Sequence, residues 1–277
     1  MLAWVGQVRI GTSGWRYPPW RGRFYPKGLP QRCELAYLSR QTTSVEINGS
    51  FYSLQYPESY RAWAAQTPDD FVFAVKGGRF ITHLKQLRDV RTPLANFFAS
   101  GVLALGHKLG PVLWQLPPRM RFDPVRMANF LALLPSTTVQ AAELATEHDV
   151  RLAGRVLTTT DRDRPLRHAV EPRHESFRDP AFRSMLADAQ VALALSDAGG
   201  VWPRFDDVTA DLVYVRLHGA DELYASGYSP RALDSWAERV RQWYANGLDV
   251  YLYFDNDAKV HAPFDAIALL ERVRDLL

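Results

Sequence analysis

Short apolar runs alternate along this chain with segments whose apolar residues recur at helical spacing. A run of about four to eight apolar residues, bounded by Gly, Pro or charged residues, is typical of a buried β-strand. Eight strands are predicted on this basis, at residues 8–12, 44–48, 71–76, 111–116, 168–173, 191–196, 212–217 and 249–254.

Helix signals follow most of these strands. Asp123 stands before Pro124, and Ser229 before Pro230, and such pairs are typical of an N-cap followed by the first helical turn. Helices are predicted at residues 33–41, from 57, after 93, at 123–134, near 179–180, at 230–244 and from 262 to the end. The long connection at residues 136–166 is expected to hold an extra helix near residues 139–148.

Alternating strands and helices predict a parallel sheet, and eight such units in about 250 residues are typical of a TIM barrel. We therefore expect an α/β, (β/α)8 TIM-barrel-like fold, a single domain over residues 1–277, with an extra segment between helix 4 and strand 5. An open doubly wound sheet is the alternative. The first turn, residues 11–15, matches neither the dinucleotide nor the P-loop pattern. Residues 219–229 are long for a connection and predict a mobile lid over the seventh strand.

Composition sets limits on class and location. The 277 residues are 47% hydrophobic, which is enough for a large core. Cys33 is the only cysteine, so an intramolecular disulfide and a Cys-rich zinc site are excluded. Residues 1–6 lack a signal-peptide pattern, and no run approaches the roughly 18 apolar residues of a membrane helix, so we expect a cytoplasmic protein without membrane contact. The net charge is +3, and the positive residues are scattered rather than gathered in the basic stripe usual for nucleic-acid binding.

Polar residues close several of the predicted strands. Alternate residues of a barrel strand face the helices or the interior, so Arg216 and His218 should face inward while Val215 faces the helices. Barrel enzymes place their chemistry at the C-terminal strand ends. The residues predicted to face inward at these ends are Glu46, Asn48, Lys76, Gln115, Glu171, Arg173, Arg216, His218 and Asp255.

The leading hypothesis is an enzyme that uses acid/base chemistry on a small anionic or polyhydroxylated substrate. Arginine and lysine suit carboxylate or phosphate groups, and histidine titrates near neutral pH. Glu171 and His218 are predicted to transfer protons, with Glu46 and His174 as further catalytic candidates. The predicted substrate-binding residues are Lys76, Arg173, Arg216, Asn48, Gln115, Asp197, Asp255, Asn256, Trp15 and Tyr17. No cofactor is predicted.

Two alternatives use the same polar strand ends. Glu46 and Glu171 could form the carboxylate pair of a glycosidase. The fourth and seventh strands, which carry that pair in common barrel glycosidases, offer Gln115 and Arg216 instead. The second alternative is a network of salt bridges that only closes the top of the barrel, because buried charges must be paired whatever their role.

A metal-dependent hydrolase or isomerase is a further alternative. No local pair of residues has the spacing of metal ligands on one helix, and the nearby cations oppose a metal ion. The residues of suitable ligand type are Glu46, Glu171, His174, Asp197 and His218.

The first loop, residues 15–26, is aromatic and basic. Aromatic rings interleaved with arginines can stack on bases, which makes a nucleic-acid or nucleotide-binding protein another alternative. Prolines and Gly22 favour a folded hydrophobic cap instead.

Motifs spread over the whole chain resemble the YecE-like family, the domain-of-unknown-function family number seventy-two. They begin with Gly11-Thr12-Ser13-Gly14-Trp15, Trp20, Gly22 and Phe24-Tyr25-Pro26, and continue with Glu46-Ile47-Asn48, Ser50-Phe51-Tyr52, Lys76 and Thr82-His83. They end with residues 113–117, 171–177, Asp197, residues 214–219 and residues 253–256.

The resemblance implies a TIM-barrel-like fold, in agreement with the strand count, and implies no activity. The motif residues of the family fall largely on the strand ends that the alternation selects. Two positions depart from the family pattern. Asp255 stands where asparagine is frequent, and Pro172 interrupts the fifth motif.

Overall fold

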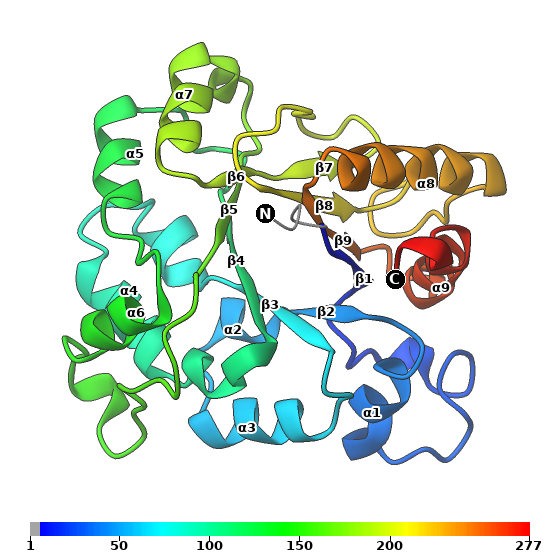
Figure 1. Ribbon diagram of the computed structural model, residues 1–277, viewed down its shortest axis with the longest axis horizontal. Coiled ribbons are helices and arrows are strands. Elements are labelled where there is room, and N and C mark those ends of the chain that lie inside the picture. Colours follow the sequence, from blue (N-terminus) through cyan, green and yellow to red (C-terminus); the bar gives the residue numbers. More distant parts are fainter. Residues whose placement is uncertain (1–5) are drawn as a thin grey trace, which may run out of the picture. The chain divides into compact units, whose positions relative to one another are not determined.

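The computed structural model describes residues 6–277 (Figure 1). These residues form two compact units. Unit 1 comprises residues 6–46 and 192–277, and unit 2 comprises residues 47–191. The expectation that the chain begins without a signal sequence rests on its first residues, and positions 1–5 lie outside the described residues. The prediction of a single domain over residues 1–277 stays a prediction.

Unit 1 is built on parallel strands. The order is β2–β1–β9–β8–β7, and Ser13 is in register with Glu46 and Arg216 with Tyr253. Because the strands are parallel, their carboxyl ends lie along one edge. The strands are β1 (Val8–Ser13), β2 (Ser44–Ile47), β6 (Ala192–Leu193), β7 (Leu195–Asp197), β8 (Leu212–Leu217) and β9 (Asp249–Phe254).

Helices cover one side of these strands. Helix α9 packs on β1 and β9, and α8 packs on β9 and α9 (Figure 1). The predicted start of α8 is confirmed, since the Ser229 side chain accepts a hydrogen bond from the Ala232 N–H at 3.2 Å and Pro230 opens the helix. The helices of unit 1 are α1 (Glu34–Leu38), α8 (Pro230–Ala245) and α9 (His261–Arg272), with 3₁₀ turns η1 (Pro18–Trp20), η2 (Gln31–Cys33) and η7 (Arg274–Leu276).

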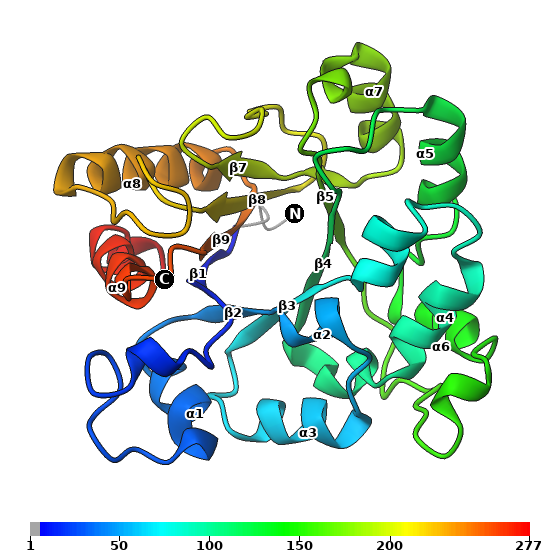
Figure 2. The same ribbon diagram turned by 180° about the vertical axis from the view of Figure 1, so that it is seen from behind.

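Unit 2 repeats the alternation. Its strands β3 (Val72–Lys76), β4 (Leu109–Gln115) and β5 (His168–Glu171) are parallel neighbours in that order (Figure 2). Asp123 caps α5 as predicted, because its carboxylate accepts from the Arg126 N–H at 3.1 Å. The helices are α2 (Gly49–Tyr52), α3 (Pro57–Ala65), α4 (Arg91–Ala99), α5 (Pro124–Leu131), α6 (Thr138–Ala145) and α7 (Pro180–Asp188). Shorter turns are the π-helical η3 (Phe80–Leu84) and the 3₁₀ turns η4 (Val102–Lys108), η5 (Val150–Leu152) and η6 (Glu175–Arg178).

Most of the predicted elements are confirmed. Strands 7 and 8 agree residue for residue with β8 and β9, and α6 is the extra helix expected between α5 and β5. The sixth predicted strand is wrong in detail, since residues 191–196 give two short strands, β6 and β7. The Leu193 N–H donates to the Thr209 hydroxyl at 2.8 Å, and this side-chain bond occupies a backbone donor of the run.

A tryptophan organises the core of unit 2. Trp114 is fully buried, and a Cβ placed on Gly77 would lie 2.2 Å from its ring, so only glycine fits there. The indole N–H donates to His168 Nδ1 at 3.1 Å, and His168 Nε2 lies 2.8 Å from the Pro135 carbonyl. Burial lowers the pKa of His168 to about 4, so the ring is neutral at pH 7. Its two nitrogens connect the Trp114 indole to the Pro135 carbonyl inside the core.

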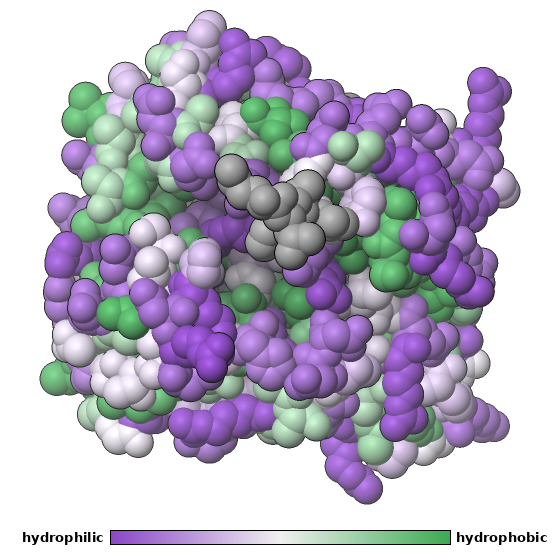
Figure 3. Space-filling view, in the orientation of Figure 1, coloured by the Kyte–Doolittle hydropathy of each residue, from purple (hydrophilic) through white to green (hydrophobic). Residues whose placement is uncertain are grey.

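The molecular face in Figure 3 is mostly hydrophilic, with hydrophobic side chains scattered among polar ones. Scattered apolar residues of this kind are normal on a protein surface. Within residues 6–277, no helix combines the length and the apolar character that crossing a bilayer requires.

A lysine closes the carboxyl end of α3. Lys108 is 6% exposed, and its ammonium donates to the carbonyl oxygens of Ala64 at 2.8 Å and Thr67 at 2.9 Å. These carbonyls lie at a helix end, where intrahelical donors are missing and a positive charge is favourable. Burial lowers the pKa of Lys108.

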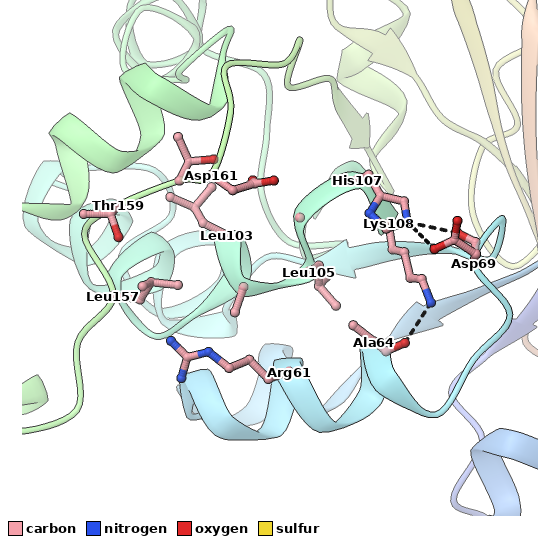
Figure 4. A pocket seen from close by; sticks show the side chains of 13 residues that line it. Arg61, Ala64, Asp69, Leu103, Leu105, His107, Lys108, Leu157, Thr159 and Asp161 are labelled. Carbon is pink, nitrogen blue, oxygen red and sulfur yellow. Dashed lines mark hydrogen bonds and ion pairs between the residues drawn. The ribbon is translucent and has the colours of Figure 1, made fainter.

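The same lysine lines a hollow of about 550 Å³ beside η4 (Figure 4). The lining is mixed, with apolar residues such as Leu103 and Leu157 beside Arg61 and an exposed pair in which His107 Nε2 lies 3.0 Å from the Asp69 carboxylate. Lys108 precedes the first residue of β4, so the hollow lies at the amino end of that strand. Conserved chemistry in barrel enzymes belongs to the opposite, carboxyl ends.

Replacing Lys108 by methionine should lower the free energy of unfolding by about 1–3 kcal/mol, because charged hydrogen bonds to helix-end carbonyls are lost. Urea unfolding followed by circular dichroism measures this. Lys27→Met is the matched control, since Lys27 is exposed, and it should stay within about 0.5 kcal/mol of the wild type. Equal effects of the two substitutions would contradict the capping role.

Candidate functional site

The carboxyl ends of the strands of unit 1 carry a connected polar cluster. The predicted inward orientation of Glu46, Arg216 and His218 is confirmed, since their side chains meet on one side of the sheet. The cluster consists of Ser13 from β1, Glu46 from β2, Tyr214 and Arg216 from β8, His218 directly after β8, and Asp255 directly after β9.

The guanidinium of Arg216 is the centre of this cluster and is fully buried. Its Nη2 lies 2.9 Å from Ser13 Oγ, from Glu46 Oε1 and from Asp255 Oδ2. Its Nε lies 3.1 Å from Glu46 Oε2, so the contact with Glu46 is bidentate. A bidentate arginine–carboxylate pair fixes the orientation of both side chains as well as their separation.

Both carboxylate oxygens of Glu46 are engaged. Oε1 accepts a short hydrogen bond from the Ser13 hydroxyl, and Oε2 accepts from the Tyr214 hydroxyl at 2.6 Å. Burial, and then the nearby Glu46 charge, raise the pKa of Tyr214 well above its usual value. The catalytic role assigned to Glu46 from the sequence stays a prediction, and its contacts fit a group that positions Arg216.

His218 is held by the same cluster. Its Nδ1 lies 3.0 Å from Asp255 Oδ2, and the Arg216 guanidinium donates towards its Nε2 at 3.4 Å. The rings of Trp202 and Tyr224 approach it edge-on, with centroid distances of 5.2 and 5.5 Å. These contacts fit an imidazole that carries its proton on Nδ1, next to the carboxylate.

Asp257 is a member of the site that sequence reasoning missed. Burial first, and then the charge of Asp255, raise its pKa from 3.8 to about 7, and His218 opposes this shift. Burial likewise raises the pKa of Asp197, whose carboxylate accepts from the Tyr228 hydroxyl at 3.2 Å. Alternation gave no signal for Asp257, because it lies three residues past the end of β9, where the strand period no longer applies.

The Asn256 side chain hydrogen-bonds to the segment that the sequence predicts to be a lid. Its side-chain amide donates to the Ser226 carbonyl at 2.9 Å and to the Asp265 carboxylate at 2.8 Å. Asp265 also accepts from the Tyr228 N–H at 3.2 Å. Asn256 therefore ties the segment 219–229 to α9. Its substrate-binding role stays a prediction, as does the mobility of that segment.

The first loop folds into an aromatic cap. Trp15, Trp20 and Tyr25 are buried, and the Tyr25 hydroxyl donates to the Trp15 carbonyl at 2.7 Å. Tyr17 stacks obliquely on Trp20 with centroids 4.9 Å apart, and its hydroxyl donates to the Ser13 carbonyl. This packing fits the cap that the prolines favoured. The assignment of Trp15 and Tyr17 to substrate binding stays a prediction.

The strand ends of unit 2 carry a second, cationic cluster. Lys76 closes β3, Gln115 closes β4 and Arg173 follows β5, and each is at most 8% exposed. The Arg173 guanidinium binds the buried Glu171 carboxylate at 2.8 Å. Sequence reasoning missed His83 as a site residue, because it lies in the π-helical turn η3, seven positions after the end of β3.

Two predicted residues of unit 2 have local roles. His174 Nδ1 accepts from the Ser176 N–H at 3.0 Å and so caps η6. Asn48 is the residue before α2, and its carbonyl accepts from the Phe51 N–H at 3.1 Å. Their assigned parts in catalysis and substrate binding stay predictions.

No group of three or more His, Cys, Asp or Glu side chains in residues 6–277 is arranged to hold a metal ion. Two carboxylates of unit 1, those of Glu46 and Asp255, instead form ion pairs with Arg216. The metal-dependent alternative stays a prediction.

A family described as Protein of unknown function DUF72 matches residues 9–276. The chain belongs to this family. The UPF0759 protein YecE of Escherichia coli (strain K12) is 25% identical over 287 residues, covering 98% of this chain and 94% of YecE. The UPF0759 protein YunF of Bacillus subtilis (strain 168) is 28% identical over 116 residues, 40% of each chain.

Two solved structures of the DUF72 family are similar in fold. One, from Thermotoga maritima, has a TM-score of 0.75 at 23% identity and covers 97% of this chain and 99% of its own. Another, from Enterococcus faecalis, has a TM-score of 0.73 at 16% identity and covers 97% and 96%. At these identities the likeness shows the fold alone, and the α/β, TIM-barrel-like fold predicted from the sequence is confirmed.

Glu46→Gln should lower the free energy of unfolding by about 3–5 kcal/mol, because it leaves the buried Arg216 guanidinium short of a counter-charge. Chemical denaturation measures the loss. Glu147→Gln is the matched control, since the Glu147–Arg91 pair is exposed and exposed pairs add little to stability. A loss below about 1 kcal/mol for Glu46→Gln would show that the network does not hold unit 1 together.

Asp257 should make stability depend on pH. Its raised folded-state pKa of about 7 means that the folded chain holds more protons than the unfolded chain between about pH 4 and pH 7, so stability falls as pH rises through this window. Asp257→Asn should therefore be more stable than the wild type at pH 8, by on the order of 1–4 kcal/mol, and equal to it near pH 4. Urea titrations at both pH values test this, and a difference independent of pH would refute it.

Proposed function

We propose that the protein is an enzyme that transfers protons on a small polyhydroxylated substrate at the carboxyl ends of the strands of unit 1. The observation that carries the proposal is the buried network around Arg216. Burying a guanidinium with two carboxylates costs desolvation energy, and apolar residues of similar volume often give equal or greater stability. A network of this kind at the strand ends of an α/β fold is therefore better explained by chemistry than by stability.

Asp257 is the group best suited to transfer the proton. A carboxyl group whose pKa lies near 7 can donate in its protonated form and accept in its ionised form at neutral pH. Asp255 is only two residues away but is held by Arg216 at 2.9 Å. Two carboxyl groups in such different environments are typical of divided acid and base roles.

His218 and Arg216 take supporting roles in this proposal. The Asp255 carboxylate orients the imidazole, and the guanidinium keeps Asp255 and Glu46 in place. The proton-transfer role of His218 predicted from the sequence is retained, with Asp255 as the group that lies next to its Nδ1 at 3.0 Å. Glu171 and His174 belong to unit 2 and are bound to Arg173 and Ser176 there, so they are not needed for this step.

The charge of the cluster favours hydroxyl groups over anions. The carboxyl groups of Asp197 and Asp257 interact electrostatically with His218, and Asp255 lies in contact with that ring. Carboxylates accept hydrogen bonds from substrate hydroxyls, whereas a negatively charged substrate would be repelled.

The nucleic-acid alternative has weaker support. It relied on the aromatic residues of the first loop, and Trp15, Trp20, Phe24 and Tyr25 are at most 6% exposed. Base stacking requires an accessible ring face.

Thermal unfolding against neutral sugars, polyols and cyclitols should find stabilising probes, since a ligand at 100 times its Kd adds about 2.7 kcal/mol. Proton NMR in D2O should then show product formation or C–H exchange for a stabilising probe. Asp257→Asn should keep the stabilisation and lose at least about 100-fold in turnover, which is the scale of general acid/base catalysis.

Asp206→Asn is the matched control, because Asp206 is an exposed aspartate of the same unit, and it should leave binding and turnover unchanged. Turnover by Asp257→Asn at the wild-type rate would refute the proposed role. Stabilisation by none of the neutral probes would refute the substrate class.

A further inference from the structure

Three aromatic side chains of unit 2 lie open to solvent. Tyr52 is 70% exposed, Tyr56 is 50% exposed and Phe80 is 38% exposed. Burying an aromatic ring is strongly favourable, so single exposed rings are ordinary but a connected group of them marks a surface that contacts another molecule. Whether these three rings are connected therefore decides how they are explained.

Two arginines join Tyr56 to Phe80. The Arg155 guanidinium lies over the Tyr56 ring, 4.4 Å from its centre, and the Arg151 guanidinium lies over the Phe80 ring at 5.5 Å. Arg155 Nη2 also donates to the Arg151 carbonyl at 3.4 Å. The two pairs of ring and guanidinium are thus neighbours, although α3 and η3, where the rings stand, are separated along the chain by β3.

A chain of ring contacts brings Tyr52 to the same surface. The Tyr52 ring packs edge-on against Phe51 with centroids 5.1 Å apart, and Phe51 packs edge-on against His83, also at 5.1 Å. His83 belongs to η3, the single π-helical turn that Phe80 opens. The three exposed rings are therefore connected through direct contacts and one short turn.

Two further arginines flank the turn η3. Arg79 directly precedes Phe80, and the Arg119 guanidinium donates to the His83 carbonyl at 3.3 Å. Both side chains belong to exposed residues. Burial first, and then nearby cations that include both of these arginines, lower the pKa of His83 to about 4, so the positive field of the arginines reaches the ring contacts beneath.

The carboxylates near these arginines do not cancel their charge. Arg151 is paired with Asp149 at 3.7 Å, and Glu58, two residues after Tyr56, is paired with Arg61 at 3.3 Å. Within residues 6–277, the other three arginines of the surface form no salt bridge: Arg79, Arg119 and Arg155. We call the whole set the aromatic–arginine surface, and its members are Tyr52, Tyr56, Phe80, Arg79, Arg119, Arg151 and Arg155.

We propose that the aromatic–arginine surface binds a single-stranded nucleic acid. Each nucleotide carries a planar base, which stacks on an exposed ring, and a phosphate, which an arginine binds with two parallel hydrogen bonds. An acidic peptide matches the charge but offers few planar groups to the rings. A double helix keeps its bases stacked on one another, so its bases are closed to these rings.

This surface differs from the first loop, whose aromatic rings are buried, and it meets the requirement for an accessible ring that the loop does not. All of its members belong to unit 2. The proposal therefore goes beyond the acid/base chemistry proposed for unit 1 and does not depend on it.

The test is fluorescence anisotropy of the full chain with labelled oligo(dT) and oligo(U) of about 12 nucleotides, and with a DNA duplex of equal length. Saturable binding of a single strand is expected, with the duplex at least about tenfold weaker. Three or four bound phosphates predict that raising the salt from about 50 to 200 mM weakens binding by roughly 20- to 50-fold. Tighter binding of oligo(dT) would indicate DNA as the partner, and tighter binding of oligo(U) would indicate RNA.

Substitutions locate the bound strand. Tyr52→Ala and Tyr56→Ala should each weaken binding at least about fivefold, because each removes a ring on which a base stacks. Arg155→Gln should weaken binding and lower the slope of log K against log salt by about 0.7, the value for one phosphate contact on a single strand. The matched controls are Phe264→Ala and Arg231→Gln, since both residues are exposed and belong to unit 1, and both variants should bind as the wild type does.

Four results would each overturn the proposal. They are the absence of single-strand binding at about 50 mM salt, binding of the duplex as tight as that of the single strand, unchanged binding in both tyrosine variants, and an equal loss of binding in the control variants. Because the substituted side chains are exposed, all of these variants are expected to fold, and circular dichroism checks this.

Discussion

The buried guanidinium of Arg216 is the constraint on which unit 1 depends. A positive charge removed from water must be balanced by nearby acceptors, and these come from β1, β2 and the end of β9 as Ser13, Glu46 and Asp255. Because the fork of an arginine has fixed geometry, the contacts set where these strands end relative to β8. The same contacts orient His218, which follows two residues after Arg216 and lies against Asp255.

Burial acts on ionisable groups in both units. In unit 1, burial raises the pKa of Asp257 to about 7, and the charge of Asp255 adds to this shift. In unit 2, burial lowers the pKa of His83 to about 4, and nearby cations add to that shift. Burial disfavours the charged form in each case, and the neighbouring charges act in the same direction.

Alternation along the strands was a good guide to the site, because side chains on parallel strands follow a strict period of two. It selected both Glu46 and Arg216 as inward-facing residues, and the structure joins them in a bidentate contact although they are 170 positions apart. It could not reach residues beyond the strands. Asp257 lies past the end of β9 and His83 in a π-helical turn, where backbone geometry has no fixed period, so their positions depend on how each turn packs.

The sequence alone determined the alternation of strands and helices, the TIM-barrel-like class, the caps at Asp123 and Ser229, and the inward orientation of Glu46, Arg216 and His218. These properties are local, since they follow from the period of apolar residues and from capping chemistry. Only the tertiary structure decided which polar groups hold one another and which are placed for chemistry. Asn256 hydrogen-bonds to the loop 219–229, His174 caps the turn η6, and Glu46 forms an ion pair with Arg216. Asp257, by contrast, has a raised pKa. Burial and the distances between charges set these roles, and both arise only when distant segments pack together.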